Sequence, residues 1–168
     1  AAIGLEQGAP LEELLRSGVA AGTATIMTVG DVSFTKEMKK DYTILAPNML
    51  PMHFELILQV MRNYGYKIDL LKTEGRQIVD AGLKYVHNDT CYPALLVIGQ
   101  FIDAIQSGKY DPHKVALLLF QTGGGCRASN YVSLLRKALA KAGYGYVPVI
   151  GFSLSGIEKH PGWNLSVP

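Results

Sequence analysis

The stretch VALLLFQTGGGC, residues 115–126, decides the fold that we predict for this chain. Its first half, Val115–Phe120, is a continuous apolar run with the length of a buried strand. Three glycines follow, and a glycine-rich turn lets the backbone change direction within a few residues. Cys126 then opens a helix over Arg127–Ala142, which Gly143 closes. Strand, tight turn and helix together form the unit from which parallel sheets are built.

Strands and helices alternate along the rest of the chain. The predicted strands are Tyr42–Ala46, Lys67–Leu71, Val115–Phe120 and Val147–Phe152. The predicted helices are His53–Tyr64, Gly75–Tyr85, Ala94–Gln106 and Arg127–Ala142, and less regular segments are a turn or short helix at Phe34–Lys40, a helix at Pro10–Ser17 and a strand at Thr23–Val29. The alternation predicts an α/β fold: a three-layer Rossmann-like or flavodoxin-like domain with a mainly parallel sheet, right-handed crossovers and a strand order near 2-1-3-4.

The helix Arg127–Ala142 also shows which of its faces is buried. Its apolar stripe of Val132, Leu135 and Leu139 is predicted to face the core. The charged residues predicted to face water are Arg136, Lys137 and Lys141.

Cys91 and Cys126 are the only cysteines, and both lie where a helix is predicted to begin. Asp89 or Thr90 can cap the first of these helices, and Pro93 is tolerated in its first turn. Unpaired N–H groups at a helix start favour an anion or a thiolate. The extra helix between the second and third strands brings Cys91 back to the carboxyl edge of the sheet, where open α/β sheets bind ligands. The alternative is that both thiols are small buried apolar groups.

Other chemistry at these positions has weaker support. The turn Gly123, Gly124 and Gly125 could bind an anion or cofactor, but neither a Walker lysine nor the GxGxxG spacing accompanies it. His53 and His87 are candidate bases for a reactive thiol. A structural zinc site would need two more ligands than the cysteines supply. Iron–sulfur ligation matches the two thiols if further ligands come from elsewhere.

The composition indicates one globular domain. The 168 residues are 48% hydrophobic, and 16 basic against 14 acidic residues give a net charge of +2, too small to indicate nucleic acid or an anionic membrane as a partner. Two cysteines and no secretory signal predict a reducing, cytoplasmic location. We expect an N-terminal extension at 1–33 and an α/β domain at 34–168, and we expect the chain to be a fragment of a larger multidomain protein.

Four motifs resemble one region of a known family: FTKEMKK at 34–40, LKYVHNDTCYP at 83–93, QTGGGCRASNY at 121–131 and GIEKHPG at 156–162. The family is the activator-related proteins of the 2-hydroxyacyl-CoA dehydratase system, also called CoA-substrate-specific enzyme activases, in their dehydratase-subunit-like region. The resemblance implies oxygen-sensitive [4Fe–4S] chemistry in anaerobic bacteria and ATP-driven electron transfer at low potential. It implies Cys91 and Cys126 as cluster ligands. Candidates for residues that support such a cluster are Gln121, Thr122, Arg127 and Asn130, and their alternative role is in the turn and the helix cap.

The resemblance also implies partners. ATP would be bound only by domains outside this chain, and catalysis by the isolated fragment is not expected. The expected partners are other domains of the parent chain or a partner subunit, an acyl-CoA and, as an open alternative, a second copy of the chain; neither nucleic acid nor a membrane is expected. A metal-free binding or scaffolding domain for acyl-CoA or a partner subunit is the main alternative, and a thiol enzyme using Cys126 with a histidine base is the third.

Overall fold

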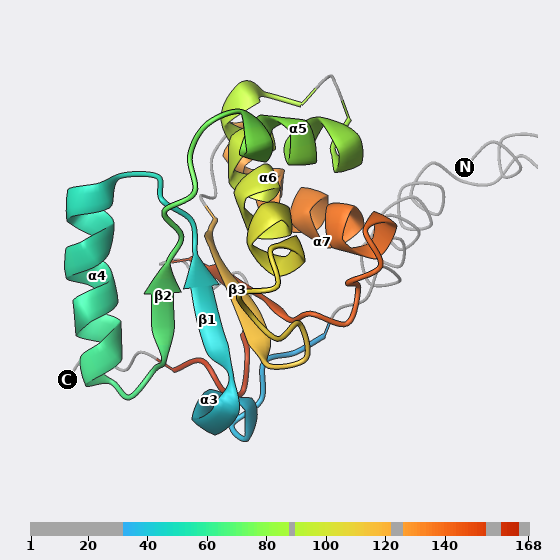
Figure 1. Ribbon diagram of the computed structural model, residues 1–168. Coiled ribbons are helices and arrows are strands. Elements are labelled where there is room, and N and C mark those ends of the chain that lie inside the picture. Colours follow the sequence, from blue (N-terminus) through green and yellow to red (C-terminus); the bar gives the residue numbers. More distant parts are fainter. Residues whose placement is uncertain (1–31, 88–89, 122–125, 154–158, 165–168) are drawn as a thin grey trace, which may run out of the picture.

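The computed structural model describes residues 32–87, 90–121, 126–153 and 159–164. Within them one parallel sheet has the strand order β2-β1-β3-β4 (Figure 1). Its strands are β1 (Thr43–Ala46), β2 (Ile68–Leu70), β3 (Val115–Phe120) and β4 (Val149–Phe152). The α/β class and the strand order predicted from the sequence are therefore confirmed.

The helices also follow the predicted pattern. They are α3 (Met38–Asp41), α4 (Pro51–Asn63), α5 (Arg76–Tyr85), α6 (Tyr92–Gln106), the 3₁₀ helix η1 (Arg127–Asn130) and α7 (Tyr131–Lys141). α4 starts earlier than predicted because Pro51 occupies its first turn, where a missing N–H is tolerated. Gly65 ends this helix with a φ of 81°, a conformation that suits glycine.

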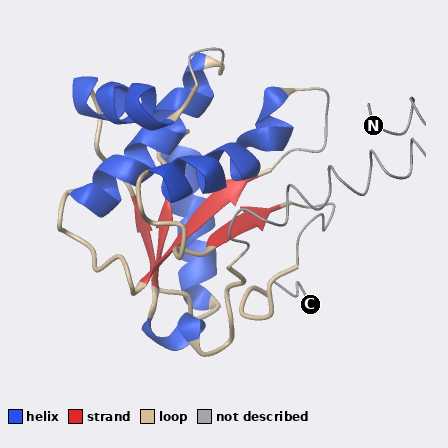
Figure 2. Cartoon of the chain, turned by 90° about the vertical axis from the view of Figure 1, so that its right-hand side faces the viewer, coloured by secondary structure: helices blue, strands red, loops and turns tan. Residues whose placement is uncertain are grey.

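Helices cover both faces of the sheet (Figures 1 and 2). Residues of β3 alternate between two cores, so Leu117 and Leu119 pack with α6 and α7, while Leu118 packs with α4. α5 makes its main contacts with α6 and forms an outer layer on that face. The two cores lie between the sheet and the helices on each of its faces, so the domain has the three α–β–α layers that the sequence predicts.

The path of the chain creates a switch point in the sheet. From β1 it crosses to β2 by way of α4 on one face. From β2 it passes β1 and enters β3 by way of α6 on the other face, and α7 leads on to β4. The direction of travel along the sheet thus reverses between β1 and β3. In open α/β sheets ligands bind outside the carboxyl ends of the strands at this point.

The segment 159–164 returns to the beginning of the described domain. The N–H of Phe34 donates to Nδ1 of His160 (3.4 Å), and the N–H of Gly162 donates to the carbonyl of Phe34 (2.8 Å). The hydroxyl of Tyr66 donates to the carbonyl of Gly162 (3.3 Å). Phe34 and Gly162, the first and last residues of the four motifs that resemble the known family, are therefore in direct contact.

Two sequence-based predictions about helix ends need correction. The N-cap of α6 is Cys91, which has extended backbone and accepts the N–H of Leu95 at 3.2 Å, so Thr90 does not cap this helix. Asp89, the other predicted cap, lies outside the described residues. The helix after Cys126 is not α-helical throughout, because η1 precedes α7.

The prediction that Arg136 faces water is wrong. Its side chain is buried, and Nη2 donates to the carbonyl of Val149 at 3.3 Å. A long arginine stem can cover apolar surface while its guanidinium reaches a polar partner. Val132, Leu135 and Leu139 are buried as predicted, and Lys137 and Lys141 are exposed.

None of the helices in the described ranges has both the length and the apolar character required to cross a membrane.

Candidate thiol site

One of the two cysteines contacts the hydroxyl of Tyr131, the first residue of α7. Sγ of Cys91, at the start of α6, is 3.1 Å from Oη of Tyr131. Cys91 is half-buried, whereas Cys126 is exposed at the N-cap of η1. Sγ of Cys126 accepts the N–H of Ala128 at 3.5 Å. Each thiol therefore lies at the start of a helix.

The electrostatics of Tyr131 connect the two thiols. Burial raises the pKa of Tyr131 to about 12, and the hydrogen bond with Cys91 and the negative charges of Cys91 and Cys126 act in the same direction. At neutral pH this hydroxyl is protonated and can donate to a thiolate.

Two glutamine side chains organise the carboxyl edge of the sheet beside this site. Nε2 of Gln121, directly after β3, donates to the carbonyl of Ser129 at 2.9 Å and so fixes the start of η1–α7. The buried Gln100 of α6 accepts the N–H of Asn48 at 2.9 Å and donates to the carbonyl of Thr73 at 2.8 Å. Gln100 thereby ties the loops after β1 and β2 to one helix. Sequence reasoning missed it, although a lone amide within the apolar run of α6 is the signal that could have found it.

Several other predicted site residues are either outside the described residues or exposed. Gly123, Gly124, Gly125 and Thr122 lie outside the described residues, as does the side chain of Arg127. His53 is exposed on α4, which covers the opposite face of the sheet from α6 and α7. His87 and Asn130 are exposed.

The donor atoms at the thiol site match only part of a metal site. In the part of the chain that the structure describes, no three His, Cys, Asp or Glu side chains gather as a metal-binding group. Two thiol sulfurs are the right ligand type for an iron–sulfur cluster, which needs further ligands to be complete. Cys91 and Cys126 thus fit an incomplete ligand set.

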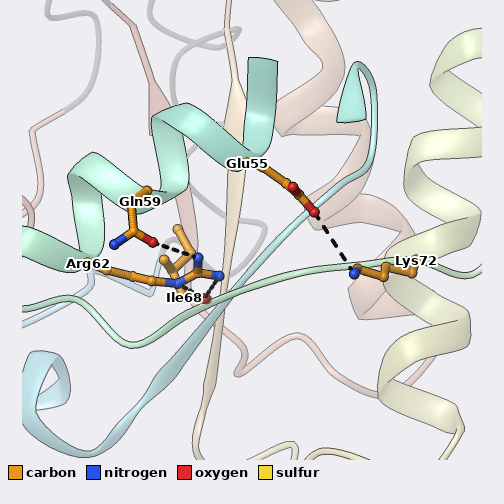
Figure 3. Close-up of polar contacts among 5 residues, drawn as sticks. All are labelled: Glu55, Gln59, Arg62, Ile68 and Lys72. Carbon is orange, nitrogen blue, oxygen red and sulfur yellow. Dashed lines mark hydrogen bonds and ion pairs between the residues drawn. The ribbon is translucent and has the colours of Figure 1, made fainter. Parts of the chain in front are cut away.

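A cavity of about 630 Å³ lies away from the thiols, beside the outer edge of β2. Its lining includes cations and anions from α4, from β2 and from the loops that follow β2 and α6: Glu55, Arg62, Asp69, Lys72 and Lys109. Arg62 donates from Nε and Nη2 to the carbonyl of Ile68 at 3.2 and 2.9 Å, and Lys72 is 4.0 Å from Glu55 (Figure 3). The mixed charges give this cavity no strong preference for an anion or a cation.

Comparisons of the chain with protein-family models, curated proteins and solved structures find no match.

Proposed function

We propose that this chain is part of an ATP-dependent activase or 2-hydroxyacyl-CoA dehydratase-like protein and helps to bind an iron–sulfur cluster through Cys91 and Cys126. The main support is geometric: two thiols far apart in the sequence lie at two helix starts, and one of them contacts the hydroxyl of Tyr131, the first residue of the helix that follows the other. Thiolates are the usual ligands of such clusters. The motif resemblance supports the same assignment.

The residues of this chain have distinct roles in the proposal. Cys91 and Cys126 would hold the cluster, while the hydroxyl of Tyr131, 3.1 Å from the sulfur of Cys91, would donate a hydrogen bond to the thiolate and orient it. The group would supply electron transfer at low potential when bound. The remaining ligands would come from other domains or a partner subunit, which would also bind ATP.

Iron and acid-labile sulfide content, together with the absorption spectrum, test this proposal. The measurement uses a longer protein that contains the remaining ligands, purified without oxygen and then reconstituted. We expect Cys91→Ser and Cys126→Ser each to lose bound iron, and we expect the control His53→Ala to keep it because His53 lies on the opposite helix layer. Unchanged iron content in Cys126→Ser would refute the assignment.

The second candidate function is a metal-free binding or scaffolding domain for an acyl-CoA or a partner subunit. An exposed apolar stripe on α4 favours a protein contact: Met52 is 82% exposed, Leu56 70% and Val60 48%. Apolar side chains at this spacing on the outer face of a helix are typical of a surface that another element covers.

This candidate predicts that Leu56→Asp releases the partner domain or subunit from the parent assembly, measured as a loss of mass by light scattering. Gln59→Asp is the control, since Gln59 is exposed and is not part of the apolar stripe. An assembly of the same mass in Leu56→Asp would exclude α4 as the contact surface.

A further inference from the structure

Residues 159–164, which we call the latch, lie against the start of the described domain. His160 is buried there, and its Nδ1 accepts the N–H of Phe34 at 3.4 Å. A ring nitrogen accepts a hydrogen bond only while it carries no hydrogen, so this contact requires a neutral imidazole with its proton on Nε2. The protonation state of His160 therefore decides whether one contact of the latch can form.

Close backbone contact fixes the position of the latch beside His160. The N–H of Gly162 donates to the carbonyl of Phe34 at 2.8 Å, and a Cβ on Gly162 would collide with the carbonyl oxygen of Thr35. The latch backbone thus touches the backbone of residues 34–35 and has no room to shift while it stays bound. Because a small movement cannot relieve a lost His160 contact, that loss favours release of the latch as a unit.

The other end of the latch packs against Tyr66, which precedes β2. The hydroxyl of Tyr66 accepts the N–H of Asn164 at 2.9 Å. The ring centre of Trp163 lies 4.8 Å from that of Tyr66 and 6.0 Å from that of Phe152. Trp163 is the only tryptophan of the chain, so its fluorescence reports whether the latch is closed.

Ionisable groups surround the latch on several segments. They are Lys36, Glu37, Lys39, Lys40 and Asp41 of residues 34–41, Tyr42, Tyr66, and Lys159 of the latch, while Glu158 precedes the latch and lies outside the described residues. Glu37 and Asp41 are exposed, and Nζ of Lys39 lies 4.0 Å from the centre of the Tyr66 ring. Water screens exposed carboxylates, so these two offset a positive charge on a buried imidazole only weakly.

We propose that His160 is a pH-sensitive switch: the neutral imidazole keeps residues 159–164 on the domain, and protonation releases them and exposes Trp163. When Nδ1 takes a proton from water, its new N–H faces the N–H of Phe34, and the contact becomes repulsive. A buried imidazolium whose hydrogen has no acceptor is unfavourable, whereas water accepts that hydrogen once the latch is released.

The closed latch binds fewer protons than the released one, so its stability falls as the pH falls. Histidine ordinarily changes its charge between about pH 5 and pH 8, so the switch operates near neutral pH. It contains neither cysteine and needs no metal, so it goes beyond the proposed iron–sulfur function and does not depend on it.

The fluorescence of Trp163 in the metal-free chain tests this proposal. From about pH 8 to about pH 5 we expect the emission to move to longer wavelength and quenching by acrylamide to increase, while the helical circular dichroism stays unchanged. Because one proton is bound, the ratio of released to closed chains should rise by no more than about tenfold for each pH unit. An unchanged Trp163 signal, or a change that coincides with loss of helix, would overturn the proposal.

A matched pair of variants assigns the response to His160. His160→Asn places Oδ1 where Nδ1 lies, so it keeps an acceptor for Phe34 that does not titrate, and the Trp163 signal should lose its pH dependence. His53→Asn makes the same change at an exposed position on α4 and should keep the full response. A full response in His160→Asn, or a lost response in His53→Asn, would refute the switch.

A measurement on the natural chain decides if His160→Asn does not fold. The ring signals of His160 in nuclear magnetic resonance should titrate with the same midpoint as the Trp163 fluorescence, and different midpoints would refute the switch. The iron-content test does not involve residues 159–164, so the two proposals fail separately.

Discussion

At the scale of single residues, Tyr131 is where the two cysteine segments meet. Its hydroxyl contacts Cys91, which precedes β3, and its phenol senses the charge of Cys126, which follows β3. In the sequence, Tyr131 is only the last residue of the motif QTGGGCRASNY, and no pattern predicts a role for it. The contact depends on how α6 and α7 pack, and no local pattern specifies that packing.

The raised pKa of Tyr131 predicts a loss of stability at high pH in the metal-free protein. With a folded pKa of about 12 against an ordinary value of 10.0, the unfolded chain releases this proton first. The stabilising effect of the protonated phenol is complete below pH 10 and is lost as the pH rises to about 12. Urea unfolding should therefore show a decline between these values that is smaller in Tyr131→Phe by about 2 kcal/mol. Equal declines in both proteins would contradict this prediction.

The buried guanidinium of Arg136 gives a second prediction at this scale. Arg136→Ala removes the donor to the Val149 carbonyl and the apolar stem that packs beside it. We expect the free energy of unfolding to fall by about 1–3 kcal/mol. Lys137→Ala is the control one position along the same helix, and because Lys137 is exposed its change should stay within about 0.5 kcal/mol. Similar urea midpoints for the two variants would show that Arg136 has no structural role.

At the scale of elements, α5 and α6 approach each other through two glycines. A Cβ on Gly99 would lie 1.9 Å from the carbonyl oxygen of Ile78, and one on Gly82 would lie 2.5 Å from that of Leu95. These neighbours are backbone atoms, so they can yield only if the helices separate. The close contact explains why α5 can stay attached as an outer layer although its main packing is against one helix.

Substitution of either glycine should therefore destabilise the domain. Gly99→Ala is expected to lower the free energy of unfolding by about 3 kcal/mol, the upper range for overpacked sites. Gly145→Ala serves as the control, since its Cβ would meet nothing closer than 3.5 Å. Thermal unfolding followed by circular dichroism compares the two, and a melting temperature for Gly99→Ala equal to that of the control would contradict the close helix contact.

The outer edge of β2 is protected against pairing with another chain by Arg62. The N–H of Ile44 and the carbonyl of Ala46 bond to Lys67 and Leu71, so the backbone groups of Ile68 face outward. The guanidinium of Arg62 donates to the outward-facing carbonyl of Ile68. A charged side chain at a sheet edge discourages pairing with a strand of another chain.

Arg62→Ala should thus increase self-association, measured by sedimentation velocity at several protein concentrations. Arg76→Ala is the control: it removes an exposed arginine that pairs with Asp80 on α5, and it should leave self-association unchanged. The role of Arg62 in protecting the edge would be disproved if both variants sediment alike.

At the scale of the whole molecule, the layer order and strand order could be predicted because they follow from apolar runs, glycine stops and alternation. The positions of the thiols at helix starts followed from the same signals. The sequence could not show the contact of Cys91 with Tyr131, the double hydrogen bond of Gln100 or the burial of Arg136. Each of these depends on the distance between elements, which local pattern does not encode.

The strand order also has a consequence for how the chain folds. β1 pairs with β2 across a short connection, but its pairing of Thr43 with Val115 closes a loop of about 70 residues. Such distant pairings form slowly, and Cys126 and Tyr131 follow β3 along the chain. We therefore expect the contact between Cys91 and Tyr131 to form late in folding, after β1, α4 and β2 have formed. A newly synthesised chain contains Cys91 before Tyr131 and Cys126 have been added, so under the proposed function a cluster could be loaded only at the last stage of maturation.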